Sequence, residues 1–377
     1  MTIRTNILIV DDSRIFRSAI EESLAGESDI TVIGSVRNGV KAIEFIESKH
    51  PDLVTLDVEM PDMNGLETLK AIQFINASGK NSHPIGVIMV SSFTRKGADI
   101  TIKSLETGAF DFITKPEGKN FSESIEILHR QLVVKIRYFA SGRISSLLSK
   151  KRKAKEQKKK DYRCPSPETQ APVCTSGLSG IRAIFIGVST GGPKALAEIL
   201  PSLCEKTDVP VFIVQHMPPH FTQSLAESLN SKCRFTVMEG RNEDAVRERH
   251  VYIAPGGRHM LVRQNNGKIV TVVNMQPPEK GCRPSADVLF RSAAAVYGNR
   301  AVAIILTGMG TDGTKGAGTL KRAGAYVIAQ DEETSVVWGM PGSAEASGNV
   351  DAVLPLGKIP DSVYALINGH NRTVRSH

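Results

Sequence analysis

The chain has 377 residues, 41% of them hydrophobic and 23% charged, with a formal net charge of +8. This length accommodates two domains with a core each, and no apolar run is long enough to span a bilayer. The first residues lack the apolar region of a signal peptide. Five cysteines without a C-x-x-C pair argue against a disulfide framework or a zinc site. We therefore expect a cytoplasmic protein.

Most of the positive charge comes from one segment. Residues 150–160, KKRKAKEQKKK, hold seven Lys and one Arg against one Glu, so the rest of the chain is nearly neutral. Such a charge block is most often a solvated linker, and a phosphate-binding tail is the less frequent alternative. Residues 141–179, rich in Lys, Ser and Pro, are therefore predicted to be a basic flexible linker.

Short apolar runs alternate with helical patterns before this linker. The runs are NILIVDD, TVIGSV, LVTLDV, IGVIMVSS and FDFITKP, and the segments between them carry apolar residues at steps of three and four. Five strands alternating with five helices predict a parallel sheet covered on both faces. We expect this α/β domain to occupy residues 1–140.

Polar residues gather where these predicted strands end. Asp11 and Asp12 follow the first run, Asp57 the third, Ser91 the fourth and Lys115 the fifth. In open parallel sheets, ligands bind at the carboxyl ends of strands. Clustered carboxylates need a hard cation such as Mg²⁺, which leaves positions for phosphate oxygens. Any one Asp alone is as readily a helix cap or turn residue, but together they predict a magnesium and phosphoryl site.

Residues 1 to about 140 closely resemble a response-regulator receiver domain. The segments VDDSR, LDVEMPDMNGLE, MVSS and DFITKP stand in the order and spacing of that family. The resemblance implies a flavodoxin-like sheet in which Asp57 accepts a phosphoryl group from a histidine kinase of the CheA type. It further implies that Mg²⁺ is bound by Asp11, Asp12, Asp57 and the backbone carbonyl of Glu59. Ser91 and Lys115 would sense the phosphoryl group, and Phe112 would occupy the family's aromatic switch position.

Predicted strands and helices alternate again after the linker. The runs AIFIGVS, VPVFIVQH, AVAIILTG and AYVIAQ are predicted strands, and HMLVRQNNGKIVTVV is predicted to be a hairpin that turns at Asn266 and Gly267. Residues 180–370 are therefore expected to form a second, larger domain that is doubly wound and mainly parallel.

One turn in the second half has the pattern of an exposed nucleophile. Residues 187–191, GVSTG, fit G-x-S-x-G, in which glycines let the backbone fold sharply around a serine, here Ser189. A P-loop would need a lysine directly after its last glycine, where Pro193 intervenes, and the dinucleotide fingerprint G-x-G-x-x-G is absent. A serine that only caps the following helix remains the alternative.

A nucleophilic serine needs a base and an acid that orients the base. His216 closes VPVFIVQH, and Asp312 lies in the glycine-bounded loop after AVAIILTG. The other candidates are weaker. His220, His250 and His259 lie in predicted turns or at strand beginnings. Asp244 lies in a charged segment, and Asp287 lies at a helix start, where capping is expected. Ser189, His216 and Asp312 are the best triad, and their chain order differs from that of α/β-hydrolases.

Residues 180 to about 366 strongly resemble the catalytic domain of chemotaxis protein-glutamate methylesterases, the CheB family. The matching segments are IGVSTGG, QHMPPHFT, YIAPGGRHM, RPSADVLF, LTGMGTDG and VVWGMP. The resemblance implies that Ser189 is the nucleophile, His216 the base and Asp312 its orienting acid. Thr190 and Met309 would support the oxyanion, with the backbone N–H of Met309 as the favoured donor. Val188, where the family often has Ala, and the long basic linker depart from the pattern.

The expected function is hydrolysis of glutamate methyl esters on methyl-accepting chemotaxis receptors, with deamidation of receptor glutamines as a second activity. The esterase reaction is expected to need no cofactor, and the resemblance implies that the unphosphorylated receiver covers the catalytic cleft. A DNA-binding response regulator and an inactive adaptor are the alternatives. No helix-turn-helix pattern follows the linker, and the basic block lacks aromatic residues that could stack on bases. We therefore expect neither nucleic-acid binding nor membrane insertion.

Overall fold

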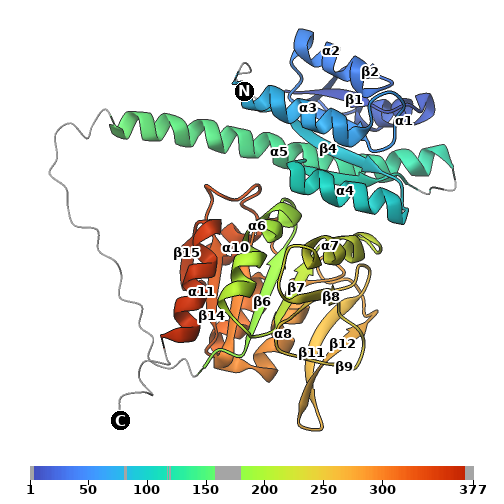
Figure 1. Ribbon diagram of the computed structural model, residues 1–377. Coiled ribbons are helices and arrows are strands. Elements are labelled where there is room, and N and C mark those ends of the chain that lie inside the picture. Colours follow the sequence, from blue (N-terminus) through green and yellow to red (C-terminus); the bar gives the residue numbers. More distant parts are fainter. Residues whose placement is uncertain (1–3, 80–82, 117, 119, 158–179, 370–377) are drawn as a thin grey trace.

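The computed structural model describes residues 4–79, 83–116, 118, 120–157 and 180–369. It consists of two α/β domains that pack against each other, here called the N-terminal domain (from β1 into α5) and the C-terminal domain (from β6 to α11) (Figure 1). Among the described residues, none of the helices combines the length and apolar character that a membrane crossing requires.

The N-terminal domain is built on five parallel strands in the order β2-β1-β3-β4-β5, which confirms the predicted sheet. Buried residues of α2, α3 and α4 cover one face of the sheet, and those of α1 and α5 cover the other. The strands are β1 (Thr5–Val10), β2 (Ile30–Val36), β3 (Leu53–Asp57), β4 (Gly86–Ser91) and β5 (Asp111–Thr114). The helices are α1 (Arg14–Leu24), α2 (Gly39–Lys49), α3 (Gly65–Ala77), α4 (Arg95–Thr107) and α5 (Phe121–Gln157).

The C-terminal domain has a parallel sheet of seven strands in the order β15-β14-β13-β6-β7-β10-β8. Its strands are β6 (Ala183–Val188), β7 (Val211–Gln215), β8 (Thr236–Glu239), β10 (His250–Ile253), β13 (Ala301–Ile305), β14 (Tyr326–Gln330) and β15 (Ala352–Leu354). The helices are α6 (Gly192–Lys206), α7 (Phe221–Asn230), α8 (Ala286–Val296), α9 (Thr314–Arg322), α10 (Met340–Ala346) and α11 (Ile359–Asn368). The four strands predicted from apolar runs are its central members β6, β7, β13 and β14.

The predicted hairpin is also present. Strands β11 (His259–Asn265) and β12 (Lys268–Asn274) pair antiparallel, and β12 also pairs with β9 (Asp244–Ala245). Asn266 and Gly267 both have positive φ, at 46° and 77°, which is the backbone conformation that an Asn-Gly hairpin turn adopts.

The order of the larger sheet determines where the site forms. β6 lies between β13 and β7, so the chain continues from β6 to one side of the sheet and reaches β13 on the other. At such a switch point the loops after neighbouring strands separate and leave room for a ligand. Ser189, His216 and Asp312 lie in the loops that follow β6, β7 and β13, three adjacent strands.

Helix α5 continues beyond the predicted end of the first domain. It runs to Gln157, well into the predicted linker 141–179. Its last part, SSLLSKKRKAKEQ, consists mostly of Lys, Leu, Arg, Ala, Glu and Gln, which have high helix propensity, so a cluster of positive charge does not by itself predict a flexible chain. The remaining predicted linker residues, 158–179, lie outside the described residues.

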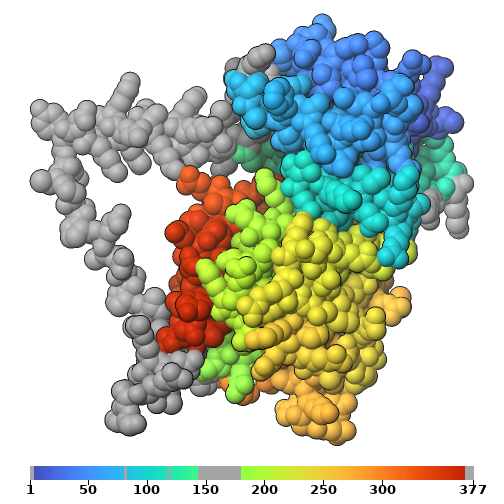
Figure 2. Space-filling view, viewed as in Figure 1, coloured from blue at the N-terminus to red at the C-terminus, as the bar shows by residue number. Residues whose placement is uncertain are grey.

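The two domains share a continuous hydrophobic core. Helix α4 of the N-terminal domain packs against α6 and α7, and one cluster of buried apolar side chains includes residues of both domains. Figure 2 shows the N-terminal domain, in blue and teal, lying directly on the yellow-green atoms of the C-terminal domain. The domain interface therefore forms part of the packed interior.

Candidate active site

Ser189 occupies a tight turn between β6 and α6. Its N–H donates to the Thr307 carbonyl (3.0 Å), and its own carbonyl accepts from the Gly192 N–H (2.8 Å). Gly191, at the helix N-cap, has a φ of 79°, and a Cβ there would approach Val336 to 2.7 Å. This position therefore requires glycine for both its conformation and its packing. The local sequence explains why the chain can turn at Ser189.

His216 is held next to this turn by the pairing of β6 with β7. Val188 is opposite Gln215 in the parallel register, and the His216 N–H donates to the Val188 carbonyl (3.2 Å). The buried side chain of Gln215 donates through Nε2 to the Ser189 carbonyl at 2.9 Å. Gln215 thus fixes the serine turn relative to the strand that carries the histidine, a role that sequence reasoning did not detect.

Asp312 connects the histidine to the N-terminus of helix α8. Its Oδ2 lies 2.8 Å from His216 Nε2 and accepts the Ala286 N–H at 2.6 Å. Its Oδ1 accepts hydrogen bonds from Ser285 Oγ (2.8 Å) and the Asp287 N–H (3.1 Å). The carboxylate therefore caps α8 from a distant loop, where the positive end of the helix stabilises its charge.

The assignment of helix capping to Asp287 is therefore wrong. Asp287 is fully buried, its Oδ1 accepts the Gly316 N–H at 2.6 Å, and its Oδ2 lies 2.9 Å from Lys280 Nζ. The free N–H groups at the start of α8 are instead satisfied by Asp312, which the order of the sheet brings close. Asp287 links this helix to neighbouring segments.

These contacts determine the charge of the pair. Burial raises the pKa of Asp312, but hydrogen bonds from His216, Ser285 and Ala286 outweigh burial and bring it to about 2. Burial lowers the pKa of His216, but the hydrogen bond with Asp312 and the nearby Cys282 thiol raise it to about 9. In this arrangement both ring nitrogens of His216 are protonated at neutral pH, so the side chain is an imidazolium.

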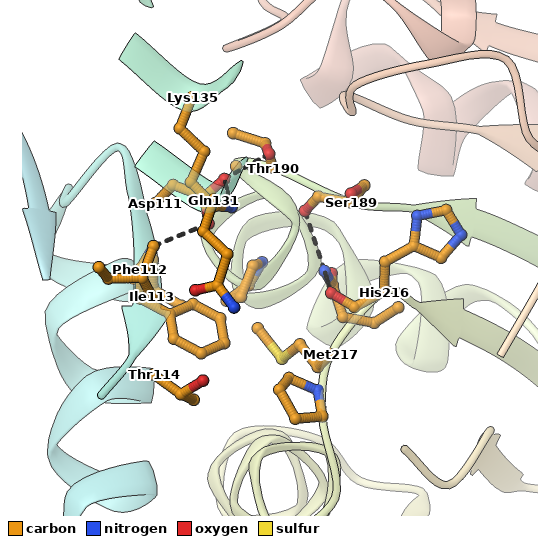
Figure 3. A pocket seen from close by; sticks show the side chains of 15 residues that line it. Asp111, Phe112, Ile113, Thr114, Gln131, Lys135, Ser189, Thr190, His216 and Met217 are labelled. Atoms are coloured by element: carbon orange, nitrogen blue, oxygen red, sulfur yellow. Dashed lines mark hydrogen bonds and ion pairs between the residues drawn. The ribbon is translucent and has the colours of Figure 1, made fainter. Parts of the chain in front are cut away.

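Ser189 and His216 lie side by side on neighbouring strand ends (Figure 3). Within the described part of the chain, however, Ser189 Oγ makes no hydrogen bond with the imidazole. Proton transfer between the two side chains therefore needs a local rearrangement, as is common for catalytic groups without bound substrate.

Thr190 and Met309 lie on either side of the serine. The Thr190 hydroxyl donates to Asp111 Oδ2 of the N-terminal domain at 2.6 Å, and its carbonyl accepts from Thr307 Oγ1 at 2.9 Å. A Cβ at Gly308 would come within 2.7 Å of the Ser189 Cβ, so Met309 follows a residue in close contact with the serine. In the described residues the Met309 N–H has no hydrogen-bond acceptor, which leaves it free to bind a developing oxyanion.

The serine lies at a cavity of about 180 Å³ between the two domains. Figure 3 shows Asp111, Gln131 and Lys135 of the N-terminal domain facing Ser189, Thr190 and His216 across it. Lys135 Nζ lies 2.7 Å from Asp111 Oδ2, the atom that also binds Thr190. The N-terminal domain therefore covers this side of the site with an ion pair in which Asp111 is buried and Lys135 is partly exposed.

Other contacts strengthen the same interface. The Phe112 ring stacks on the Phe221 ring with centroids 4.6 Å apart. Arg95 pairs with Glu227 at 2.7 Å, and Glu106 Oε2 pairs with Lys232 at 2.6 Å. Phe112, which the receiver resemblance assigned to the aromatic switch position, thus lies directly between the domains.

The acidic residues of the N-terminal domain converge around Lys115. One oxygen each of Asp11, Asp12 and Asp57 lies within 4.8 Å of the others. Lys115 Nζ is 2.9 Å from Asp11 Oδ2 and 2.9 Å from Asp57 Oδ2. Burial, followed by the charge of Asp11, raises the pKa of Asp57 to about 6 despite Lys115. Lys115 therefore compensates only part of the negative charge of the three carboxylates. Their oxygen atoms are the type of ligand that Mg²⁺ prefers.

Two further predicted residues lie beside this cluster. The Glu59 carboxylate pairs with Lys96 at 2.9 Å, and its backbone carbonyl remains a predicted metal ligand. Ser91 is buried at the end of β4, and its Oγ donates to the Ser92 carbonyl at 3.2 Å rather than to Asp57. A phosphoryl group on Asp57 would have to draw Ser91 away from that local bond.

Both halves of the chain match known protein families. The family model for CheB methylesterase matches residues 184–363, and that for the response regulator receiver domain matches residues 7–125. A protein-glutamate methylesterase/protein-glutamine glutaminase of Pyrococcus horikoshii is 40% identical over 97% of this chain and 94% of its own. The Thermotoga maritima protein of the same name is 39% identical over 96% of this chain and 98% of its own.

Two solved structures of Thermotoga maritima CheB also match. Its methylesterase catalytic domain is 44% identical with a TM-score of 0.48, covering 50% of this chain and 99% of that one. Its response regulator domain is 40% identical with a TM-score of 0.31, covering 36% of this chain and 94% of that one. The near-complete alignment with the named relatives, rather than these scores, decides the assignment. This chain belongs to the CheB methylesterase family, with a response regulator receiver domain preceding the methylesterase domain.

Proposed function

We propose that the protein is a phosphorylation-regulated esterase that hydrolyses glutamate methyl esters on chemoreceptors and deamidates specific receptor glutamines. The observation that carries the proposal is the position of Ser189, His216 and Asp312 in the loops after three adjacent strands, with the His216–Asp312 pair 2.8 Å apart. The names of the full-length relatives support the same reaction.

The reaction proceeds by two acyl transfers. Ser189 Oγ attacks the side-chain carbonyl carbon, His216 accepts its proton, and Asp312 stabilises the resulting imidazolium. The Met309 N–H binds the developing oxyanion, a contribution typically worth about 2.7–4 kcal/mol for one donor. His216 returns the proton to the leaving methoxide, and methanol departs. Water then cleaves the acyl-serine and restores glutamate. A glutamine reacts in the same way and releases ammonia.

The N-terminal domain regulates this site in our proposal. A histidine kinase of the CheA type donates the phosphoryl group that Asp57 accepts. Asp11, Asp12, Asp57 and the Glu59 carbonyl are the groups that would hold Mg²⁺. The metal neutralises charge on the phosphoryl oxygens when bound. The contact between Asp111 and Thr190 supports an unphosphorylated state in which the domain covers the esterase site. Methyl-accepting receptors and this kinase are the partners, and we place the protein in the cytoplasm with them.

Methanol release from methylated receptor tests the proposal. The wild type should release methanol, and a small phosphodonor with Mg²⁺ should increase the rate. Ser189→Ala should lower kcat by at least about 10⁴-fold, since loss of a triad nucleophile leaves only binding and oxyanion stabilisation. A folded Ser189→Ala variant with the wild-type rate would show that another group is the nucleophile.

A further inference from the structure

Cys282 lies against the histidine of the candidate triad. Its Sγ is 3.9 Å from His216 Nδ1, and its other polar contact in the described residues is with the Lys280 carbonyl at 3.8 Å. The acyl-transfer reaction assigns no task to this thiol. A sulfur placed beside an imidazole and a carboxylate nevertheless completes a set of three metal-binding groups.

The segment that carries Cys282 is fixed by several contacts. Glu279 and Cys282 exchange two backbone hydrogen bonds, of 3.1 and 2.8 Å. Lys280 Nζ donates to the Thr311 carbonyl at 2.9 Å and lies 2.9 Å from the buried Asp287. Glu279 forms a bidentate pair with Arg291. The thiol is therefore held at its position over the imidazole by a closed turn.

The distances suit a thiophilic cation. One ligand atom of Cys282, His216 and Asp312 lies within 4.8 Å of each of the others. In tetrahedral zinc sites, bonds of about 2.0–2.3 Å separate the ligand atoms by roughly 3.3–3.7 Å. His216 Nε2 and Asp312 Oδ2 are 2.8 Å apart, and Cys282 Sγ is 3.9 Å from Nδ1. An ion binds only one ring nitrogen of His216, so the imidazole must rotate to bring that nitrogen between the thiolate and the carboxylate.

We infer that Cys282, His216 and Asp312 form a site for Zn²⁺ or a similarly thiophilic divalent cation, which inhibits the enzyme when bound. Thiolate and imidazole ligands favour such ions over Mg²⁺. Binding releases the thiol proton and the proton shared between His216 and Asp312. Ser285 and the start of α8 already orient the carboxylate, as groups around a metal ligand do.

The inhibitory consequence rests on the proposed function. With its ring nitrogen coordinated and its carboxylate partner on the metal, His216 cannot accept the Ser189 proton. Metal binding itself depends only on the three side chains. Metal binding and activity can therefore be measured separately.

The experiment titrates full-length protein with Zn²⁺ while methanol release from methylated receptor is followed. Mg²⁺ is kept in excess so that the Asp11–Asp12–Asp57 cluster is not the zinc site. Cys282→Ser should raise the zinc concentration for half-inhibition by at least about tenfold, the scale on which even outer-shell changes affect metal affinity. Cys233→Ser, at a half-buried thiol on another turn, is the matched control and should behave as wild type.

Co²⁺ provides a readout without activity. Wild type and Cys233→Ser should show thiolate-to-cobalt charge-transfer absorption, and Cys282→Ser and Cys282→Ala should lack it. Basal methanol release by both Cys282 variants shows that they are folded. Equal zinc inhibition of Cys282→Ser and wild type, or an unchanged cobalt band, overturns the inference. Absence of esterase activity in wild type with the cobalt band intact would refute the proposed function and leave the metal site standing.

Discussion

Replacing Asp111 with alanine tests whether the N-terminal domain holds the esterase site closed. Asp111 Oδ2 accepts the Thr190 hydroxyl at 2.6 Å, and both residues are only 6% exposed. Lys135 and the Phe112 N–H, which also bind Asp111, belong to the same domain and can keep these contacts when the domains separate. The Thr190 bond exists only while they are together, so its loss destabilises the closed state.

The size of the effect follows from the type of bond. A hydrogen bond to a charged group contributes about 1.5–3 kcal/mol, and about 1.4 kcal/mol changes an equilibrium tenfold. Asp111→Ala should therefore shift the equilibrium between closed and open states by roughly 10- to 100-fold. If the open state is rare, the methanol-release rate without phosphodonor rises by the same factor. The rate of a fragment beginning at Gly180 sets the upper limit.

Arg95→Ala is the control for this prediction. Arg95 and Glu227 also pair across the interface, but their side chains are 63% and 50% exposed. An exposed ion pair contributes about 0–1 kcal/mol, so this variant should change the rate by less than about fivefold. Unchanged or reduced basal activity of Asp111→Ala, in a protein whose Gly180 fragment is active, would refute the idea of a closing contact.

Two further predictions concern charge. Because its hydrogen bond with Asp312 outweighs burial and raises the pKa of His216 to about 9, unprotonated base accumulates only as pH rises. The kcat/KM of the unphosphorylated enzyme should thus increase about tenfold per unit below that pH. Asp312→Asn should move this rise to lower pH while reducing the maximal rate, and an unmoved profile would contradict the coupling. Asp57→Asn should keep basal methanol release but lose stimulation by phosphodonor and Mg²⁺; retained stimulation would place the acceptor elsewhere.

The central strands of both sheets could be predicted from sequence because they are buried on both faces. β6 and β13 read as continuous apolar runs, with Ser189 directly after β6 and Asp312 in the glycine-containing loop after β13. This is why Ser189 and Asp312 could be named as candidates before the fold was known. β8, β10 and β15 have only four, four and three residues, which is too short for a periodic pattern to separate them from loops.

Contacts between distant segments could not be predicted. Asp111 is one polar residue at the start of a short strand, and nothing nearby in the chain indicates that its partner is Thr190. Cys282 has no second cysteine at short spacing, so the sequence pattern does not indicate a metal site there. Its neighbours His216 and Asp312 come from two other loops that only the fold brings together. Sequence patterns can thus identify residues whose side chains could react or bind a metal, but only the fold determines which other side chains they contact.

Strand β5 links the acidic cluster to the esterase site. Lys115, directly after the strand, contacts Asp57 and Asp11, while Asp111 and Phe112 at its other end contact Thr190 and Phe221. A phosphoryl group shifts a conformational equilibrium only by interacting differently with the two states. It adds about −1.5 to −2 charges, and Lys115 is the cation that meets them. Suppose that Lys115 binds the phosphoryl group more tightly after β5 has moved. A difference in binding free energy of about 1.5–3 kcal/mol between the two states then offsets the loss of the hydrogen bond between Asp111 and Thr190. Release of the site then requires no contact between the phosphoryl group and the C-terminal domain.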